Sequence, residues 1–205
     1  MTEREIFEIE NTRPHVVILG AGATIATIPN GDKNGNPCSV MHGFIHNLGL
    51  DTILATVKLN TKSENIEDIY SELYERGDEC KAVREQLEEA IFSYLSRLEL
   101  PAEITVYDEI ILALTQKDMI ATFNWDPLLI QAYNRARKLT TNLPKLTFLH
   151  GNVAAGYCER CGHFGALQRV KCDNCGAAYH RSPLLFPVKH KDYNSNLLLS
   201  NNGLS

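Results

Sequence analysis

Short apolar runs predict three strands along the chain. The runs occupy residues 15–19, 119–123 and 145–149, and each is followed at once by glycine or by polar residues. Apolar runs of this length that end in turn-forming residues are typical of buried strands. Residues 29–37 are dense in proline, glycine and asparagine, so we expect an irregular surface loop there, which is a candidate lid.

Apolar residues at helical spacing fill the longer segments between these runs. We expect helices over residues 64–76, 78–99, 103–116 and about 127–138. Asp78 is placed to cap the second helix, and Pro101 follows its end. The apolar face of that helix should hold Val83, Leu87, Ile91, Tyr94, Leu95 and Leu98. Strands separated by helices predict parallel pairing in a layered α/β fold.

Bulk composition limits the partners. Hydrophobic residues make up 44% of the 205 residues and charged residues 22%, which is ordinary for a globular protein. The net charge of -5 argues against a protein that wraps a polyphosphate, which needs an excess of Lys and Arg. The beginning of the chain lacks the features of a secretory signal, and no apolar run is long enough to span a bilayer. We therefore expect a cytoplasmic location and no membrane partner.

Two pairs of cysteines predict a metal site. Each pair has the spacing Cys-x-x-Cys, and ten residues separate the pairs. Four thiolates complete the tetrahedral shell of a structural zinc ion, and so small a lobe has too little apolar surface to fold without one. The predicted zinc ligands are Cys158, Cys161, Cys172 and Cys175.

A zinc ribbon that binds nucleic acid is the alternative for this lobe. Its local support is a set of basic residues, Arg160, Arg169, Lys171 and Arg181. These charges are sparse and have no aromatic residues interleaved with them, so we do not expect a nucleic-acid partner.

Polar groups follow each predicted strand. The first strand leads into a glycine turn at residues 20–24, the second into residues 124–126 (Asn-Trp-Asp), and the third into residues 150–152 (His-Gly-Asn). Ligands of open parallel sheets bind beyond the carboxyl ends of the strands. A phosphate cradle, an amide, a carboxylate and an imidazole at one edge suit a nucleotide whose sugar is attacked.

Each of these groups also has a purely structural interpretation. The glycine turn lacks the third glycine of the dinucleotide-binding fingerprint, because Ile25 stands there, so it can equally be a turn without a ligand. Asn124 can be a turn residue, and Asp126 can cap the helix that Pro127 enters. His150 before a glycine can be a structural histidine. Only the joint pattern favours a binding site.

In this order, the segments resemble the sirtuin family. GAGAT at residues 20–24 is similar to the family's GAGxS turn, TFNWD at 122–126 to its TQNID segment, and LHG at 149–151 to its catalytic histidine segment, with the paired cysteines following. The PNGDKNG loop and the ATFNWDP segment resemble most closely the bacterial sirtuin-like branch that includes hydrolases of nicotinamide adenine dinucleotide (NAD). The resemblance covers roughly residues 15–190.

The resemblance implies roles for individual residues. The catalytic residues would be Asn124 and Asp126, which hold the nicotinamide-side ribose and carboxamide, and His150, the base. The cofactor-binding residues would be Gly20, Ala21, Gly22, Ala23, Thr24, Thr122 and Phe123, the first three of which line the pyrophosphate. Phe123 replaces the family's glutamine, which removes a ribose contact. No GIPDFR-like stretch follows Thr24, which argues against peptide-dependent deacylation.

The expected fold is therefore α/β, with a Rossmann-like parallel sheet, helices on both faces and a small zinc-ribbon lobe. Residues 1–151 would form the NAD-binding domain, with a helical insertion at about 40–100, residues 152–182 the zinc lobe, and residues 183–205 a return segment or tail. The sequence shows no counterpart of the family's C-terminal strands. A second copy or a partner chain that completes the fold is therefore an expected partner.

The expected function is hydrolysis of NAD to nicotinamide and ADP-ribose, with zinc as a structural metal. Two alternatives remain open. One is an NAD-dependent protein deacylase, in which an acyl-lysine oxygen attacks the ribose carbon. The other is a module without catalysis that binds NAD or ADP-ribose, or another protein, and is stabilised by zinc.

Overall fold

The main sheet contains the three predicted strands. The computed structural model describes residues 2–5, 13–38, 43–167, 171–186, 188 and 203–204. Strands β1 (Val16–Leu19), β2 (Met119–Thr122) and β3 (Lys145–Phe148) lie in this order and pair in parallel, and β7 (Gly203–Leu204) adds to β3 in the antiparallel direction. Leu19, Thr122 and Phe148 stand side by side at the carboxyl ends. The predicted parallel α/β sheet is confirmed.

Three crossover helices cover one face of this sheet. They are α2 (Ala21–Thr27), α7 (Val106–Ala113) and α8 (Leu128–Ala136). Because the chain steps from β1 to β2 to β3 in one direction, right-handed crossovers place these helices on the same side. Ile120 and Leu146 point into the core that these helices share, whereas Val16 and Ile18 on the other face of β1 are 63% and 66% exposed. As far as the described residues extend, the helices expected on both faces lie on one.

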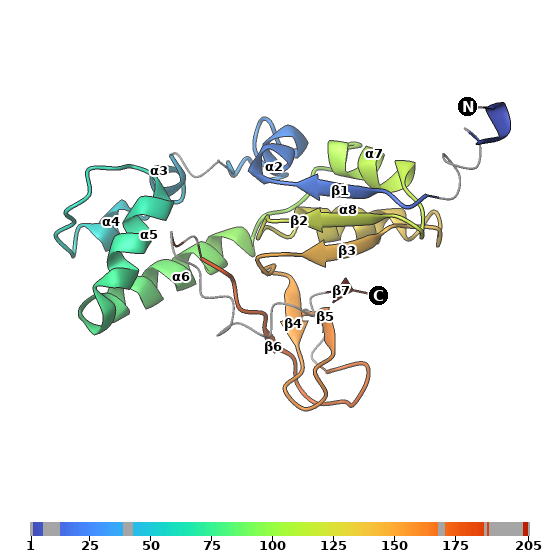
Figure 1. The fold of residues 1–205 in the computed structure, drawn as a ribbon. Coiled ribbons are helices and arrows are strands. Elements are labelled where there is room, and N and C mark those ends of the chain that lie inside the picture. Colours follow the sequence, from blue (N-terminus) through green and yellow to red (C-terminus); the bar gives the residue numbers. More distant parts are fainter. Residues whose placement is uncertain are drawn as a thin grey trace.

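A group of helices lies beyond the carboxyl ends of the strands (Figure 1). It consists of α3 (Phe44–Asn47), α4 (Asp51–Leu54), α5 (Ile66–Glu75), the 3-10 helix η1 (Gly77–Cys80) and α6 (Lys81–Leu95). Asp78 lies inside η1 and does not cap α6, whose N-cap is Cys80. The prediction is wrong here because Gly77, with φ of 60°, starts a tight turn between the two helices. Leu98 is buried, although α6 ends before it.

The loop predicted as a lid is held at its centre by Asp32. This carboxylate is 5% exposed and accepts hydrogen bonds from the backbone N–H groups of Asn34, Asn36 and Glu99, at 2.9, 2.8 and 2.9 Å. These bonds lower the pKa of Asp32, although burial alone would raise it. The loop is therefore irregular, as expected, but it is tied to the end of the helical group. Movement as a lid stays a prediction.

A second, smaller sheet carries the cysteines. It consists of β4 (Ala155–Tyr157), β5 (Phe164–Ala166) and β6 (His180–Arg181), which pair in antiparallel fashion in the order β5-β4-β6. Figure 1 shows this lobe projecting away from the main sheet after β3. None of the helices in the described ranges combines the length and the apolar character that a membrane crossing demands.

Asp118 joins the starts of β1 and β2. Its carboxylate, 2% exposed, accepts from the backbone N–H groups of His15 and Thr115, each at 2.8 Å. Burial alone would raise the pKa of Asp118, but these donors lower it well below its ordinary value. Since the pKa is lower in the folded than in the unfolded chain, the stabilisation is present above about pH 4 and is lost as the pH falls.

The Asp118→Asn variant should reveal this linkage. At neutral pH we expect its urea midpoint to lie below that of the wild type, because the two N–H groups donate to different oxygens of Asp118, and the NH2 group of an asparagine would replace one of these acceptors with a donor. The gap should narrow as the pH falls below about 5, because the unfolded wild-type chain then binds a proton at Asp118 that the folded chain does not. Other carboxylates are common to both proteins and cancel in the difference. A gap that stays constant over this range would contradict the assignment.

Candidate functional site

Backbone hydrogen bonds bring the three strand ends together. The N–H of Phe123 donates to the carbonyl of Leu19 at 3.0 Å, and the N–H of Leu149 donates to the carbonyl of Thr122 at 2.8 Å. Each bond lies at or just beyond the end of a strand, so the register of the sheet continues into the polar segments. The segments after β1, β2 and β3 therefore lie side by side at one edge.

The glycine turn presents an open surface. Gly20 is the N-cap of α2, and Gly20 and Gly22 are both exposed. A Cβ at either position would meet no atom within 4 Å, so a ligand can approach this backbone closely. Ala21 and Ala23 are half-buried, while Thr24 points inward and is 1% exposed.

The side-chain amide of Asn124 connects the second strand end to this turn. Its Nδ2 lies 2.9 Å from the carbonyl oxygen of Gly20, 2.9 Å from Thr24 Oγ1 and 3.1 Å from the hydroxyl of Tyr107. Its backbone N–H donates to Thr122 Oγ1 at 3.1 Å. Because the Gly20 carbonyl can only accept, the nitrogen of the amide must face the turn, and Oδ1 lies on the other side.

Asp126 lies behind this amide and is not at the surface. It is 4% exposed; Thr24 Oγ1 donates to its Oδ2 at 2.7 Å and the N–H of Leu128 donates to its Oδ1 at 3.1 Å. Burial raises the pKa of Asp126, and these two donors offset part of that effect. The bond to Leu128 at the start of α8 is the capping contact of the structural alternative, although the N-cap position itself is Pro127. Both oxygens are thus engaged within the protein.

His150 lies beside Phe123 at the third strand end. Their ring centroids are 4.9 Å apart in an edge-on arrangement, and Phe123 is 43% exposed while His150 is half-buried. The carbonyl of His150 accepts from the N–H of Leu185 at 2.9 Å. Gly151 follows with φ of 80°, and a Cβ there would lie 2.3 Å from the carbonyl oxygen of Pro183. The segment after the cysteine lobe therefore supports the backbone at His150 and Gly151.

Two buried residues of this region have no role in the sequence-based prediction. Tyr107 comes from α7 and brings its hydroxyl to Asn124 and Thr24. Asn152, fully buried, donates from Nδ2 to the carbonyl of Asp126 at 2.6 Å and so ties the second strand end to the third. The helical spacing of α7 marks Tyr107 as a core residue, but nothing in that spacing identifies what its hydroxyl contacts.

The four predicted zinc ligands form one cluster. Their sulfur atoms all lie within 4.8 Å of one another, with 3.4 Å between Cys158 and Cys175 and 3.6 Å between Cys161 and Cys172. These separations are far longer than a disulfide of about 2.05 Å and close to the roughly 3.8 Å between thiolates of a tetrahedral zinc site. The donor set and its geometry fit a structural zinc ion.

The local backbone of the lobe favours the same conclusion. Gly162 and Gly176, each directly after a Cys-x-x-Cys pair, have φ of 69° and 74° and donate to the carbonyls of Cys158 and Cys172 at 2.8 Å. These turns fold each pair of thiols toward the other.

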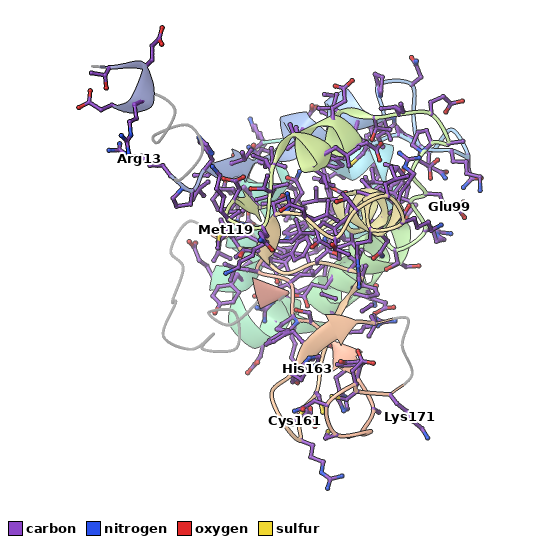
Figure 2. The ribbon with its side chains drawn as sticks, turned by 90° about the vertical axis from the view of Figure 1, so that its right-hand side faces the viewer. Arg13, Glu99, Met119, Cys161, His163 and Lys171 are labelled. Carbon is purple, nitrogen blue, oxygen red and sulfur yellow. The ribbon has the colours of Figure 1, made fainter. Side chains whose placement is uncertain are left out.

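The basic residues of the lobe do not form one free surface. Arg181 pairs with Glu89 of α6 at 2.6 Å and stacks over the ring of Phe92 at 4.1 Å, so it links the lobe to the helical group. Figure 2 shows Lys171 near the far end of the lobe, and Arg169 lies outside the described residues. Because Arg181 is already paired with Glu89, it adds little to a basic surface that could bind nucleic acid.

A cavity of about 710 Å³ lies elsewhere, between α8 and the lobe. Its lining includes Tyr133 within α8, Arg137 directly after α8, and His163 and Phe164 from the lobe. None of the residues predicted to bind NAD lines it. This cavity is therefore separate from the three strand ends.

Comparisons with known proteins give one kind of match. No family model and no curated protein matches the chain. The chain is similar to solved structures of Sir2 proteins. A structure of Sir2 bound to an acetylated peptide has 21% identity and a TM-score of 0.34, with 91% of this chain and 64% of that chain covered. A complex of Sir2 with a p53 peptide and NAD+ has 20% identity and a TM-score of 0.33, with 91% and 65% covered.

This chain thus spans about 64% of the length of the Sir2 chain in the first of these structures. These structures do not distinguish a bacterial branch of the family.

Proposed function

We propose that this protein cleaves NAD at the bond between nicotinamide and ribose, with water as the acceptor. The observation that supports this most strongly is the contact of Asn124 with the Gly20 turn, with His150 one strand away beside Phe123. An amide, an imidazole and an open glycine backbone at the carboxyl edge of a parallel sheet suit a dinucleotide.

In this proposal the pyrophosphate lies along the backbone of Gly20, Ala21 and Gly22. The neighbouring residues Ala23, Thr24, Thr122 and Phe123 shape the same crevice. Oδ1 of Asn124 accepts a hydrogen bond from a hydroxyl of the nicotinamide-side ribose. Asp126, whose oxygens are both engaged, acts from behind through Thr24.

The reaction would pass through an oxocarbenium-like state, as other glycosyl cleavages do. The C1′–N bond breaks, and nicotinamide leaves with the bonding electron pair. Water forms the new C1′–O bond and gives its proton to His150, whose unperturbed imidazole pKa near 6.5 suits a base at neutral pH. A zinc ion held by the four thiolates would have no open position, so it would stabilise the lobe without taking part in the reaction.

Wild-type protein incubated with NAD alone tests this proposal directly. We expect nicotinamide and ADP-ribose in equal amounts, and no increase in rate when an acetylated peptide is added. Release that requires the peptide, with transfer of the acetyl group to ADP-ribose, would instead establish the deacylase alternative. Saturable binding of NAD without any nicotinamide release would establish the binding module.

A second copy or partner chain that completes the crevice stays part of the proposal. If a second copy contributes to the site, the rate of nicotinamide release per chain should rise with protein concentration as the chains associate. A rate per chain that is constant from nanomolar to micromolar protein would contradict completion by a second copy.

A further inference from the structure

Tyr107 is a buried tyrosine whose hydroxyl lies within the candidate site. It is 0% exposed, and its oxygen is 3.0 Å from Thr24 Oγ1 and 3.1 Å from Asn124 Nδ2. Burial and the nearby negative charge of Asp126 raise the pKa of Tyr107, so the hydroxyl keeps its proton at neutral pH. Tyr107 therefore always has one hydrogen to donate.

The directions of the hydrogen bonds can be deduced from their chemistry. Thr24 gives its one proton to the carboxylate of Asp126, so its oxygen is free to accept. The proton of Tyr107 then goes to Thr24, and the Tyr107 oxygen accepts from Asn124. Nδ2 of Asn124 shares its two protons among three acceptors. Every donor in this buried group therefore has an acceptor, and no two donors point at each other.

The other end of the amide is available to a ligand. In the part of the chain that the structure describes, Oδ1 of Asn124 accepts no hydrogen bond, and it is not a buried atom. An amide with a single acceptor could bond to it in several orientations, but three acceptors on one side of the Asn124 amide permit only one orientation. The plane of the amide, and with it the position of Oδ1, is therefore fixed before any ligand binds.

We propose that Tyr107 is a positioning residue that orients Asn124 so that its Oδ1 accepts from a hydroxyl of the bound ribose. This proposal rests on the proposed function and extends it in one respect. The site would select a ribosyl ligand that offers a hydroxyl donor at this point, because a ligand without it leaves Oδ1 unpaired in the complex. Tyr107 itself touches no reacting atom.

The test compares Tyr107→Phe with a matched control, Tyr70→Phe. Both changes remove one hydroxyl from a buried ring, and Tyr70, 5% exposed, donates to Glu88 within the helical group. We expect Tyr107→Phe to lower kcat for nicotinamide release about ten-fold, the value of one well-placed hydrogen bond, with KM changed less than about two-fold. Tyr70→Phe should leave both constants at wild-type values.

A second readout does not depend on catalysis. Solvent exchange of the side-chain amide protons of Asn124 can be followed by NMR, with the signals assigned by their absence in Asn124→Asp. Exchange should be slow in the wild type and in Tyr70→Phe, and several-fold faster in Tyr107→Phe. The inference is overturned if Tyr107→Phe leaves this exchange unchanged, or if both variants behave alike. If the wild type releases no nicotinamide, the proposed function fails, and amide exchange alone decides the role of Tyr107.

Discussion

Removal of the metal from the cysteine lobe should unfold residues 155–182, while the main sheet, to which Asn152 and Val153 are bonded, stays folded. The strands of the lobe contain only three, three and two residues, and two of its buried side chains are the ligands Cys158 and Cys172. So little apolar burial cannot offset the entropy of ordering the chain. Zinc binding, at roughly 10–16 kcal/mol in small zinc domains, is the one contribution large enough.

Hydrogen exchange measured by mass spectrometry on zinc-loaded and chelator-treated protein would follow this change. We expect loss of protection in the lobe first, and the same loss in Cys172→Ser without chelator. Cys80→Ser is the matched control, because Cys80 is equally buried but lies outside the lobe at the start of α6. A metal-free lobe that keeps its protection would show that zinc does not stabilise it.

The same treatment should reduce nicotinamide release. The lobe carries Arg181, which pairs with Glu89, and the segment that follows the lobe carries Leu185, whose N–H donates to the carbonyl of His150. Loss of the lobe should disturb both contacts, so the backbone that positions the imidazole of His150 would lose its support. Restored release after zinc is added back would separate this effect from irreversible damage.

Substitution of His150 or Asn124, two of the three candidate catalytic residues, should have the largest effect on the reaction. We expect His150→Ala to lower the rate of nicotinamide release about 10²–10⁴-fold, the usual contribution of a general base. Asn124→Ala should lower it by about 10²-fold or more, since it removes both the ribose contact and the tie to the Gly20 carbonyl.

Controls for these variants are available in the same chain. His46→Ala removes an exposed histidine from the helical group, with 88% of its side chain accessible, and should retain wild-type release. Thermal unfolding of each variant separates loss of function from loss of fold. Wild-type turnover in both His150→Ala and Asn124→Ala would end the assignment of the site.

The sequence is sufficient to predict the strands, because each is a short apolar run followed directly by turn residues. It is also sufficient for the metal cluster, since the two Cys-x-x-Cys pairs differ from the rest of the chain in spacing and composition. The helix predicted over residues 78–99 is too long at both ends. Leu98 continues the apolar spacing and is buried, but it lies in the chain after α6. Periodicity alone cannot distinguish a buried residue within a helix from one that follows the helix.

The inner part of the candidate site could not be predicted. The contact of Tyr107 with Asn124 joins α7 to the end of β2, and that with Thr24 joins residues 83 positions apart. The burial of Asp126 likewise depends on the packing of α8 against the sheet. The local pattern reports which residue types follow the strands, whereas the directions of their side chains are tertiary properties.

The exposed side of β1 has a consequence for handling the protein. Within the part of the chain that the structure describes, β1 is the outermost strand of the main sheet. Val16 and Ile18 leave apolar side chains exposed there, and β1 contains neither proline nor a charged residue. Exposed edge strands of this kind can pair with a strand of another chain, and natural proteins usually protect them with lysine or proline. Self-association at high concentration should therefore begin at β1. The Ile18→Lys variant should improve solubility and leave the opposite, buried face of the sheet unchanged.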